Sequence, residues 1–378
     1  MVYFDNAATT MLDNVVKEEI MKSLDEYNMN PSAMYIEGFR SNKYLNNARS
    51  ILAANLGCRP EEVYFTATGT EANNIALTGS ARSRKNLGNE IVTTGYEHPS
   101  VYNTLNALRK EGFIVHEIKP SSEGLIDLEE LLSYINSRTI AVSVMHVNNE
   151  IGSIIDIEKL SEAVKSKNKR TAFHSDMIQS FMKYPIELSK TVIDTAAISA
   201  HKIHGPKGIG AIYIRKGFNI EAIIYGGNQE KGVRSGTENT SYAHAFATAA
   251  DIYLSAEYLS HVSKLQKYLV QQLKTINDVT INSPKEASSY IVNFSLPGYA
   301  SETLLHFLDS NGVMVSAGAA CSKGEKSHTL TAMGLPERKV TSSLRVSFCK
   351  DNTLEDVDIF IHALKMAKDK LISTKPRK

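Results

Sequence analysis

Short apolar runs rich in β-branched residues alternate with longer amphipathic segments over the first two thirds of the chain. The apolar runs predict strands at Val63–Thr66, Glu90–Thr93, Phe113–Ile118, Ile140–Val147, Thr171–His174, Asp194–Ile198 and Ile209–Ile214. Helical spacing between them predicts helices at Ser100–Lys110, Leu128–Asn136 and Ile157–Lys165. This alternation is typical of an α/β domain, in which a mostly parallel sheet is covered by helices.

The pattern changes after Ser241. An Ala-rich run through Ala250 continues into Leu265–Leu273 and predicts one long connecting helix. Beyond it we expect strands at Tyr290–Ser295, Gly312–Ser316 and Leu344–Phe348, and helices at Ser301–Asp309 and Leu354–Leu371. We therefore expect a large domain over residues 15–255 and a smaller α+β domain over residues 1–14 and 256–378.

The composition is that of a packed, water-soluble protein. Of 378 residues, 42% are hydrophobic and 22% are charged, close to the averages of globular chains. Lys plus Arg (42) nearly balances Asp plus Glu (41), and the net charge of +1 argues against nucleic acid as a partner. There is no run of about eighteen apolar residues that could span a membrane. Residues 1–5 do not resemble a signal peptide, so we expect a cytoplasmic protein without a membrane partner.

Three cysteines are too few for a disulfide framework, and they lack the CxxC spacing of a zinc site, so no metal ligands are expected. Cys349 follows an apolar strand and should be buried and inert, and Cys58 is expected to be structural as well. Cys321 differs because small and polar residues surround it, and an exposed thiol in a loop can move and react. Taken alone, an intracellular cysteine such as Cys321 is more often structural than reactive.

A turn of small residues, Thr66–Asn73, follows the first predicted strand of the α/β pattern and opens a helix. The free backbone amides of Gly69 and Thr70 at such a helix start suit a phosphate group. The same residues could also form an ordinary turn and N-cap.

Polar side chains follow several other predicted strands. His98 comes after the strand that ends at Thr93, and Asn149 follows the next apolar run. Asp176 and Gln179 follow the strand that ends at His174. Ligands of open parallel sheets bind at the carboxyl ends of the strands, where these side chains should meet. Each alone has an ordinary alternative: His98 as a cap or surface group, Asp176 as a helix cap.

Lys202 lies just after the strand that ends at Ile198, in the segment Ser199–Gly208. The neighbouring His201 and Lys207 would disfavour its charged form and lower its pKa, and such a lysine can form a Schiff base. A solvated basic loop is the alternative.

Together these residues weigh more than any one of them. One sheet edge would collect a phosphate cradle, a stacking imidazole, a carboxylate, amide donors and an amine. These are the parts needed to hold pyridoxal phosphate. The carboxylate keeps the ring nitrogen protonated, and the protonated ring withdraws the electrons left at the substrate Cα.

At this point the chain resembles the cysteine desulfurases of the NifS/IscS type, in the class V aminotransferase group of fold type I. The motifs that carry the resemblance run in order along nearly the whole chain: Tyr3–Thr10, Gly69–Asn73, Glu97–His98, His146–Glu150, Asp176–Gln179, Ser199–Lys202, Arg234–Thr237 and Ala320–Cys321.

The resemblance implies a role for each matching residue. Lys202 would carry the cofactor, His98 would stack on its ring and shuttle protons, and Asp176 would pair with the ring nitrogen. Gln179 and Asn149 would hold the ring oxygen and orient the substrate. The phosphate would be bound by Gly69, Thr70, Ser199 and His201, helped by Thr237 of the second subunit of a homodimer. Arg345 would clamp the substrate carboxylate.

The resemblance also implies the reaction. L-cysteine displaces Lys202 from the cofactor, the Cα proton is removed, and the Cys321 thiolate takes the substrate sulfur as a persulfide. Alanine leaves, and the sulfur passes to an acceptor protein or a small thiol. The sequence leaves the acceptor open, so an iron–sulfur scaffold, a tRNA-thiolation enzyme and thio-cofactor synthesis all remain.

Two segments depart from the family pattern. The family commonly has Asn-Pro-Ser-Ser-x-His-x-x-Gly where this chain has Asn30–Gly38, which lacks the imidazole. Gly318–Cys321 replaces Gly-Ser-Ala-Cys, and the stretch to His328 is slightly shorter than in housekeeping members. These departures concern the reach and partner of Cys321 and leave the cofactor site intact.

Two other functions remain open. A selenocysteine lyase, aminotransferase or epimerase of the same fold would keep the cofactor and work without Cys321. A non-enzymatic scaffold fits less well because both Lys202 and Asp176 are present.

Overall fold

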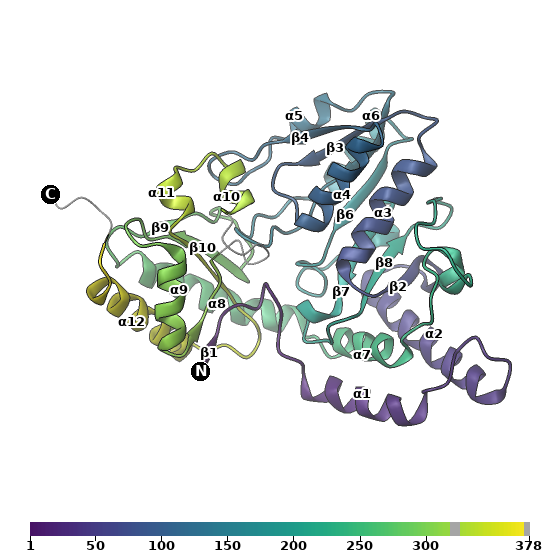
Figure 1. Cartoon of the computed structure of the whole chain (residues 1–378), viewed down its shortest axis with the longest axis horizontal. Coiled ribbons are helices and arrows are strands. Elements are labelled where there is room, and N and C mark those ends of the chain that lie inside the picture. The colour runs from purple at the N-terminus through teal and green to yellow at the C-terminus, as the bar shows by residue number, and fades with distance from the viewer. Residues whose placement is uncertain (318–325, 374–378) are drawn as a thin grey trace.

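A seven-stranded sheet forms the centre of the larger part of the molecule (Figure 1). The computed structural model describes residues 1–317 and 326–373. The strands of the sheet are β2 (Val63–Thr66), β3 (Glu90–Thr94), β4 (Ile114–Ile118), β5 (Thr139–Ser143), β6 (Ala172–Asp176), β7 (Thr195–Ser199) and β8 (Gly210–Ile214). Their order is β2-β8-β7-β6-β5-β3-β4, and only β8 runs against its neighbours. The mostly parallel sheet predicted from the sequence is confirmed.

Helices cover both faces of this sheet because successive residues of each strand point to opposite sides. Ile91 packs with α3 and α4, whereas Val92 packs with the core on the other face. Ala172 and Phe173 divide in the same way. The helices and short 3-10 turns of this part are α1 (Asn14–Glu26), α2 (Ile36–Leu56), η1 (Pro60–Glu62), α3 (Gly69–Ser83), α4 (Pro99–Lys110), α5 (Leu128–Ser133), α6 (Ile157–Lys167), η2 (Leu188–Lys190), η3 (Ala200–Lys202), η4 (Gln229–Gly232) and α7 (Thr240–Asp251).

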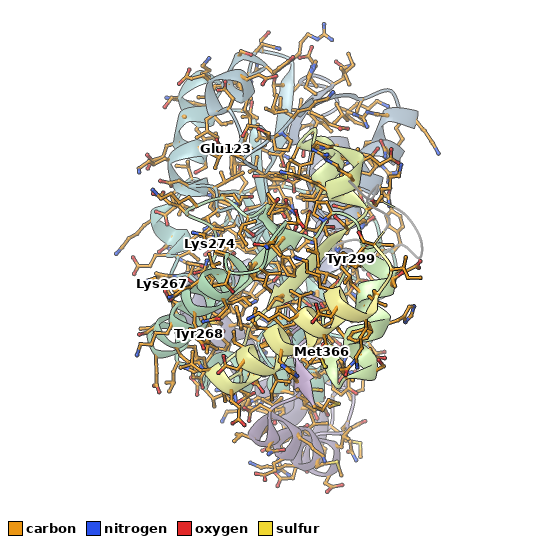
Figure 2. The ribbon with its side chains drawn as sticks, turned by 90° about the vertical axis from the view of Figure 1, so that its left-hand side faces the viewer. Glu123, Lys267, Tyr268, Lys274, Tyr299 and Met366 are labelled. Carbon is orange, nitrogen blue, oxygen red and sulfur yellow. The ribbon has the colours of Figure 1, made fainter. Side chains whose placement is uncertain are left out.

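A second, smaller core lies beside the first. It contains a three-stranded antiparallel sheet in the order β12-β10-β9 and the parallel pair β1-β11. Its elements are β1 (Val2–Tyr3), α8 (Ser255–Leu273), β9 (Thr280–Ile281), β10 (Ile291–Ser295), α9 (Ser301–Ser310), β11 (Val313–Met314), β12 (Ser343–Ser347) and α12 (Leu354–Lys370). Two short helices, α10 (His328–Ala332) and α11 (Glu337–Val340), instead bury Leu330 and Val340 in the larger core. Figure 2 shows this side of the molecule, where Tyr268 of α8 donates a hydrogen bond to Asp358 of α12 (2.6 Å).

The N-terminal residues belong to the smaller core. Val2, Phe4 and Ala7 are buried there, and β1 pairs with β11. The domain limits at residues 15 and 255 stay a prediction. Within the described ranges, we find no helix with the length and apolar character needed to cross a bilayer.

The prediction of one long connecting helix was wrong. α7 ends at Asp251 and α8 begins at Ser255, and the intervening Tyr253 is buried with its hydroxyl against that of Tyr290. Phe246 of α7 packs in the larger core, whereas Leu265 of α8 packs in the smaller one. The break lets each helix turn its apolar face toward a different core.

Most predicted strands agree with the structure to within one or two residues. Two were too long: β5 ends at Ser143 rather than Val147, and β11 covers only Val313–Met314. Val147 instead forms an isolated antiparallel bridge with Ile154. The apolar run continues beyond β5 because the loop that follows is itself buried.

The smaller core gives a stability prediction. Leu269 of α8 is fully buried, and Leu269→Ala should lower the free energy of unfolding of this core by about 2–5 kcal/mol through lost apolar contact and the cavity left behind. Chemical denaturation followed by circular dichroism measures the change. Leu254→Ala is the matched control, since Leu254 is 52% exposed, and its effect should stay within about 0.5 kcal/mol. Equal effects of the two substitutions would contradict the assignment of α8 to a packed core.

Candidate active site

The predicted site residues gather at one edge of the seven-stranded sheet. β2, β3, β6 and β7 all run in the same direction, so their carboxyl ends meet at this edge. Gly69 follows β2, His98 follows β3, Asp176 ends β6 and Lys202 follows β7. His98 is linked to Asp176 through the side chains of Ser100 and Asn73, and the charges of Asp176 and Lys202 shift the pKa of the His98 imidazole in opposite directions.

The start of α3 forms a tight cradle. The Thr68 hydroxyl caps the helix by accepting from the Glu71 amide (3.1 Å), which leaves the amides of Gly69 and Thr70 as donors at the positive end of the helix. A Cβ at Gly69 would lie 2.3 Å from Ile178 Cδ1. A side chain at position 69 would therefore require the Ile178 side chain to move.

Asp176 is held by a buried network. Its carboxylate accepts from Asn73 Nδ2 (2.8 Å) and from the Ile178 amide (2.9 Å). Asn73 is fully buried and also donates to Ser100 Oγ (2.8 Å). Asn73 Oδ1 lies 3.0 Å from His174 Nε2, so His174 must donate there. The amide of Asn73 thus has one possible orientation, with its nitrogen toward Asp176.

The same network reaches His98. Ser100 Oγ lies 2.8 Å from His98 Nδ1, and this nitrogen also accepts from the Ser100 backbone N–H (3.1 Å). Burial lowers the pKa of His98, Asp176 opposes this change and Lys202 adds to it. A neutral imidazole whose Nδ1 is an acceptor carries its proton on Nε2.

The N-terminal segment supplies acceptors for the amine. Lys202 Nζ donates to the carbonyl oxygens of Ala7 and Ala8 (both 2.6 Å). Gln179 Nε2 donates to the same Ala7 oxygen (2.8 Å). Lys183 Nζ lies 3.5 Å from Gln179 Oε1, and burial lowers the pKa of Lys183 to about 8. These contacts hold Lys202 and Gln179 against the backbone of residues 7 and 8.

Two further predicted phosphate ligands lie beside the cradle. Ser199 Cβ would be 3.4 Å from a Cβ at Gly69, and Ser199 is buried. His201 Nδ1 lies 3.3 Å from the Thr9 hydroxyl. Burial lowers the pKa of His201 to about 3, helped by Lys202 and Lys207, so this imidazole is neutral. It can donate one hydrogen bond to an anion without adding charge.

Arg345 lies deeper on the side of the smaller core. It is 2% exposed, and its guanidinium donates to Asp5 Oδ1 (2.6 Å) and to the Asn149 carbonyl (2.8 Å). Its Nε is buried without a hydrogen-bond partner among the described residues. An unpaired buried donor costs free energy, so this nitrogen invites an acceptor such as a carboxylate.

Two predicted site residues stand apart. Cys321 lies outside the residues that the structure describes. Thr237 is exposed in the segment after η4, and the contacts that join the other site residues do not include it. The other cysteines match the expectation of burial in different degrees: Cys349 is buried and Cys58 is half-buried. Burial raises the pKa of Cys58 to about 12.

Sequence reasoning gave no role to Asn73, His174 or Asp5. A buried asparagine inside a predicted helix is a signal that could have found Asn73, because it must find hydrogen-bond partners. Asp5 could not be paired with Arg345 from the sequence, since 340 residues separate them. The carbonyls of Ala7 and Ala8 leave no side-chain signal.

The described residues suit pyridoxal phosphate. The α3 cradle offers backbone amides to a phosphate, Lys202 offers an amine for an aldehyde, and Asp176 offers a fixed carboxylate for a ring nitrogen. At Gly69 the Ile178 side chain occupies the space that a Cβ would need, so the backbone of the cradle is closely packed.

Comparison with known proteins supports this interpretation. Residues 2–360 match the family model described as aminotransferase class-V. A cysteine desulfurase IscS of Clostridium botulinum (strain Hall) is 38% identical over 371 residues, which cover 96% of this chain and 93% of the relative.

Solved structures agree. A NifS-like protein superposes with a TM-score of 0.93 at 37% identity, covering 98% of this chain and all of the other. A second structure, "SspA in complex with cysteine", superposes with a TM-score of 0.82 at 31% identity, covering 93% of this chain and 100% of that one. The chain therefore belongs to the class-V aminotransferase family and, within it, to the cysteine desulfurases of the NifS/IscS type.

Proposed function

We propose that this protein is a pyridoxal-phosphate-dependent cysteine desulfurase, which converts L-cysteine to L-alanine and passes the sulfur to an acceptor. One observation carries the proposal: the amine of Lys202, the carboxylate of Asp176 and the imidazole of His98 meet beside the α3 cradle in a chain of this family. The cytoplasm is the proposed place of action, because a reactive thiol stays reduced there.

The residues of the cradle edge would hold the cofactor. The amides of Gly69 and Thr70, with Ser199 and His201, would bind the phosphate, and Lys202 would carry the group through its amine. Asp176 would pair with the ring nitrogen, His98 would lie on the ring face and Gln179 would reach the ring oxygen. Pyridoxal phosphate, when bound, supplies an electron sink for the pair left at the substrate Cα.

Arg345 would bind the substrate carboxylate. Asp5 and the Asn149 carbonyl each take one guanidinium hydrogen and fix the plane of the group, so the buried Nε points to a fixed place. The Asn149 side chain would orient the substrate from the same loop. A planar fork held in this way suits an α-carboxylate better than a lysine would.

His98 would handle the proton. Its Nδ1 is occupied by Ser100 and its pKa is lowered by burial, so near neutral pH it holds a proton on Nε2. That nitrogen is the one available to the substrate. In this tautomer Nε2 can donate its proton; as pH falls through the lowered pKa, Nδ1 is protonated as well and the hydrogen bond from the Ser100 amide is lost.

Cys321 would take the sulfur. Its thiolate attacks the substrate sulfur, the S–S bond forms as the substrate Cβ–S bond breaks, and the electron pair stays with the three-carbon fragment. Protonation of that fragment yields L-alanine and leaves a persulfide on Cys321. A protein acceptor, such as an iron–sulfur scaffold or a tRNA-thiolation enzyme, or a small thiol would then remove the outer sulfur.

We also propose that the protein forms a homodimer. α1 and the start of α2 carry a group of exposed apolar side chains at one end of the molecule (Figure 1): Met21, Leu24, Met34, Ile36 and Phe39. An apolar group of this extent is typical of a surface that another chain covers. Thr237 is exposed and would contribute to the phosphate site of the second copy.

The nucleophile can be tested directly. At matched cofactor content, Cys321→Ala should lower alanine release from L-cysteine at least about 100-fold in the presence of a reducing thiol, because no persulfide can form. Cys58→Ala is the control and should retain activity, since Cys58 is half-buried just after α2 and packs against the larger core. Equal alanine from the wild type and Cys321→Ala would indicate a lyase that does not use the thiol.

Asn73 is proposed to position Asp176 and Ser100. Asn73→Ala should lower kcat about 10- to 100-fold, since small displacements of catalytic groups have effects of this size. It should also change the absorption spectrum of the bound cofactor, because Asp176 loses a hydrogen bond that orients it. The control is Asn74→Ala, which removes only a contact to the Thr70 carbonyl. An unchanged spectrum together with unchanged kcat would contradict the positioning role.

Substitutions on the proposed dimer surface should lower the mass of the particle in solution. The wild type should behave as twice 41.7 kDa in light scattering coupled to size exclusion, and Ile36→Glu with Phe39→Glu should shift it to the monomer. Burying two carboxylates in an apolar contact is costly. Ile359→Glu on α12, at the other end of the molecule, should remain dimeric. A dimer that tolerates the double substitution would exclude this surface.

A further inference from the structure

A second cluster of reactive side chains lies outside the proposed active site. A ring nitrogen of His204, the Cys349 sulfur and a carboxylate oxygen of Asp351 all lie within 4.8 Å of one another. His204 and Cys349 are buried and Asp351 is exposed. The reaction proposed above uses none of the three.

His204 is fixed in a defined orientation. Its Nδ1 lies 3.0 Å from the Met11 carbonyl and must donate to it, so the lone pair of the neutral ring is on Nε2. Its backbone has a φ of 64°, which is uncommon for a residue with a side chain, and its amide donates to the Thr10 hydroxyl (2.7 Å). Histidines that bind metals are usually oriented by such a bond from the other ring nitrogen.

Cys349 is held in a hydrogen-bonded turn. Its amide donates to Asn352 Oδ1 (2.9 Å), and the Asn352 amide donates to the Cys349 carbonyl (3.4 Å). Burial raises the pKa of the free thiol to about 11, so a metal ion would have to displace its proton.

Asp351 is the third candidate ligand, and only one of its carboxylate oxygens pairs with Lys350. Lys350 pairs with Asp351 Oδ1 (2.9 Å) and with Asp13 Oδ2 (3.2 Å), which leaves the second Asp351 oxygen for another ligand. Asp351 is exposed, so an ion can enter from solvent.

We propose that His204, Cys349 and Asp351 bind one divalent transition-metal ion of the zinc class, with solvent in the fourth position. One nitrogen, one sulfur and one oxygen are ligands that zinc accepts in tetrahedral geometry, whereas magnesium and calcium require oxygen ligands. On binding, the metal–sulfur bond replaces the S–H bond and the thiol proton passes to solvent. The ligands need only a small closure, since zinc–ligand bonds are about 2.0–2.3 Å long.

Such an ion would tie together three segments that carry the active site. His204 follows Lys202 by two residues, Cys349 follows Arg345 by four, and the Met11 carbonyl that orients His204 follows Ala8 by three. The ion would therefore hold the amine, the guanidinium and the N-terminal segment in one arrangement. This inference does not depend on the reaction proposed above.

The test is metal binding by the full-length chain after treatment with a chelator. We expect one equivalent of Zn²⁺ per chain by calorimetry. We also expect a thiolate charge-transfer band with tetrahedral d–d bands when Co²⁺ is used as the probe. His204→Asn and Cys349→Ser should weaken Zn²⁺ binding at least about 100-fold and remove the band, because each deletes a ligand. Asparagine tolerates the left-handed backbone at position 204, so His204→Asn should fold.

Asp351→Asn is the second variant, chosen because an exposed carboxylate can be replaced with little risk to folding. It should weaken Zn²⁺ binding and abolish the rise in Tm that Zn²⁺ gives the wild type. Cys58→Ser and Cys321→Ser are the matched controls, and both should keep the cobalt band. The proposal is overturned if the wild type shows no saturable Zn²⁺ binding. It is also overturned if the band survives Cys349→Ser, or if it disappears in Cys321→Ser instead.

Discussion

The segment of residues 5–10 organises the proposed site, because its buried polar groups must find hydrogen-bond partners. Ala7 offers its carbonyl to Lys202 and Gln179, while its amide donates to Ser347 on β12. Asp5, two residues earlier, accepts from Arg345. A buried backbone must satisfy its polar groups, so this segment fixes the amine of one core against the guanidinium of the other. The two halves of the site thus share one short piece of main chain.

The interior of the site depends on neutral groups as much as on charged ones. Burial lowers the pKa of His174 to about 3, so this ring stays uncharged and acts as a donor to Asn73. Because His174 orients the Asn73 amide, the Asn73 nitrogen donates a hydrogen bond to Asp176. His174 and Asn73 therefore add no charge beside Asp176. A buried network in which each orientation is determined is costly to disturb.

The strands and much of the candidate site could be predicted from the sequence for a simple reason. Strands β2, β6 and β7 are short and almost entirely buried, and polar residues at or just after their ends lie at the sheet edge where ligands bind. Only Val16 and Ser23 of α1 are buried, whereas its apolar residues Met21 and Leu24 are exposed, so the apolar positions of this helix do not mark a single buried face. The break between α7 and α8 depends on which core each helix meets, and contacts such as Asp5–Arg345 form only when distant segments fold together.

The single reversed strand, β8, has a consequence for the reactive lysine. In an all-parallel sheet the chain leaves each strand for a long crossover, whereas β7 and β8 are adjacent and antiparallel, so residues 200–209 form the closed end of a hairpin. Lys202 thus lies three residues after β7, in a connection whose two ends are both anchored by paired strands. The backbone that carries the amine is therefore held by the hydrogen bonds of the sheet and does not rely on a distant helix.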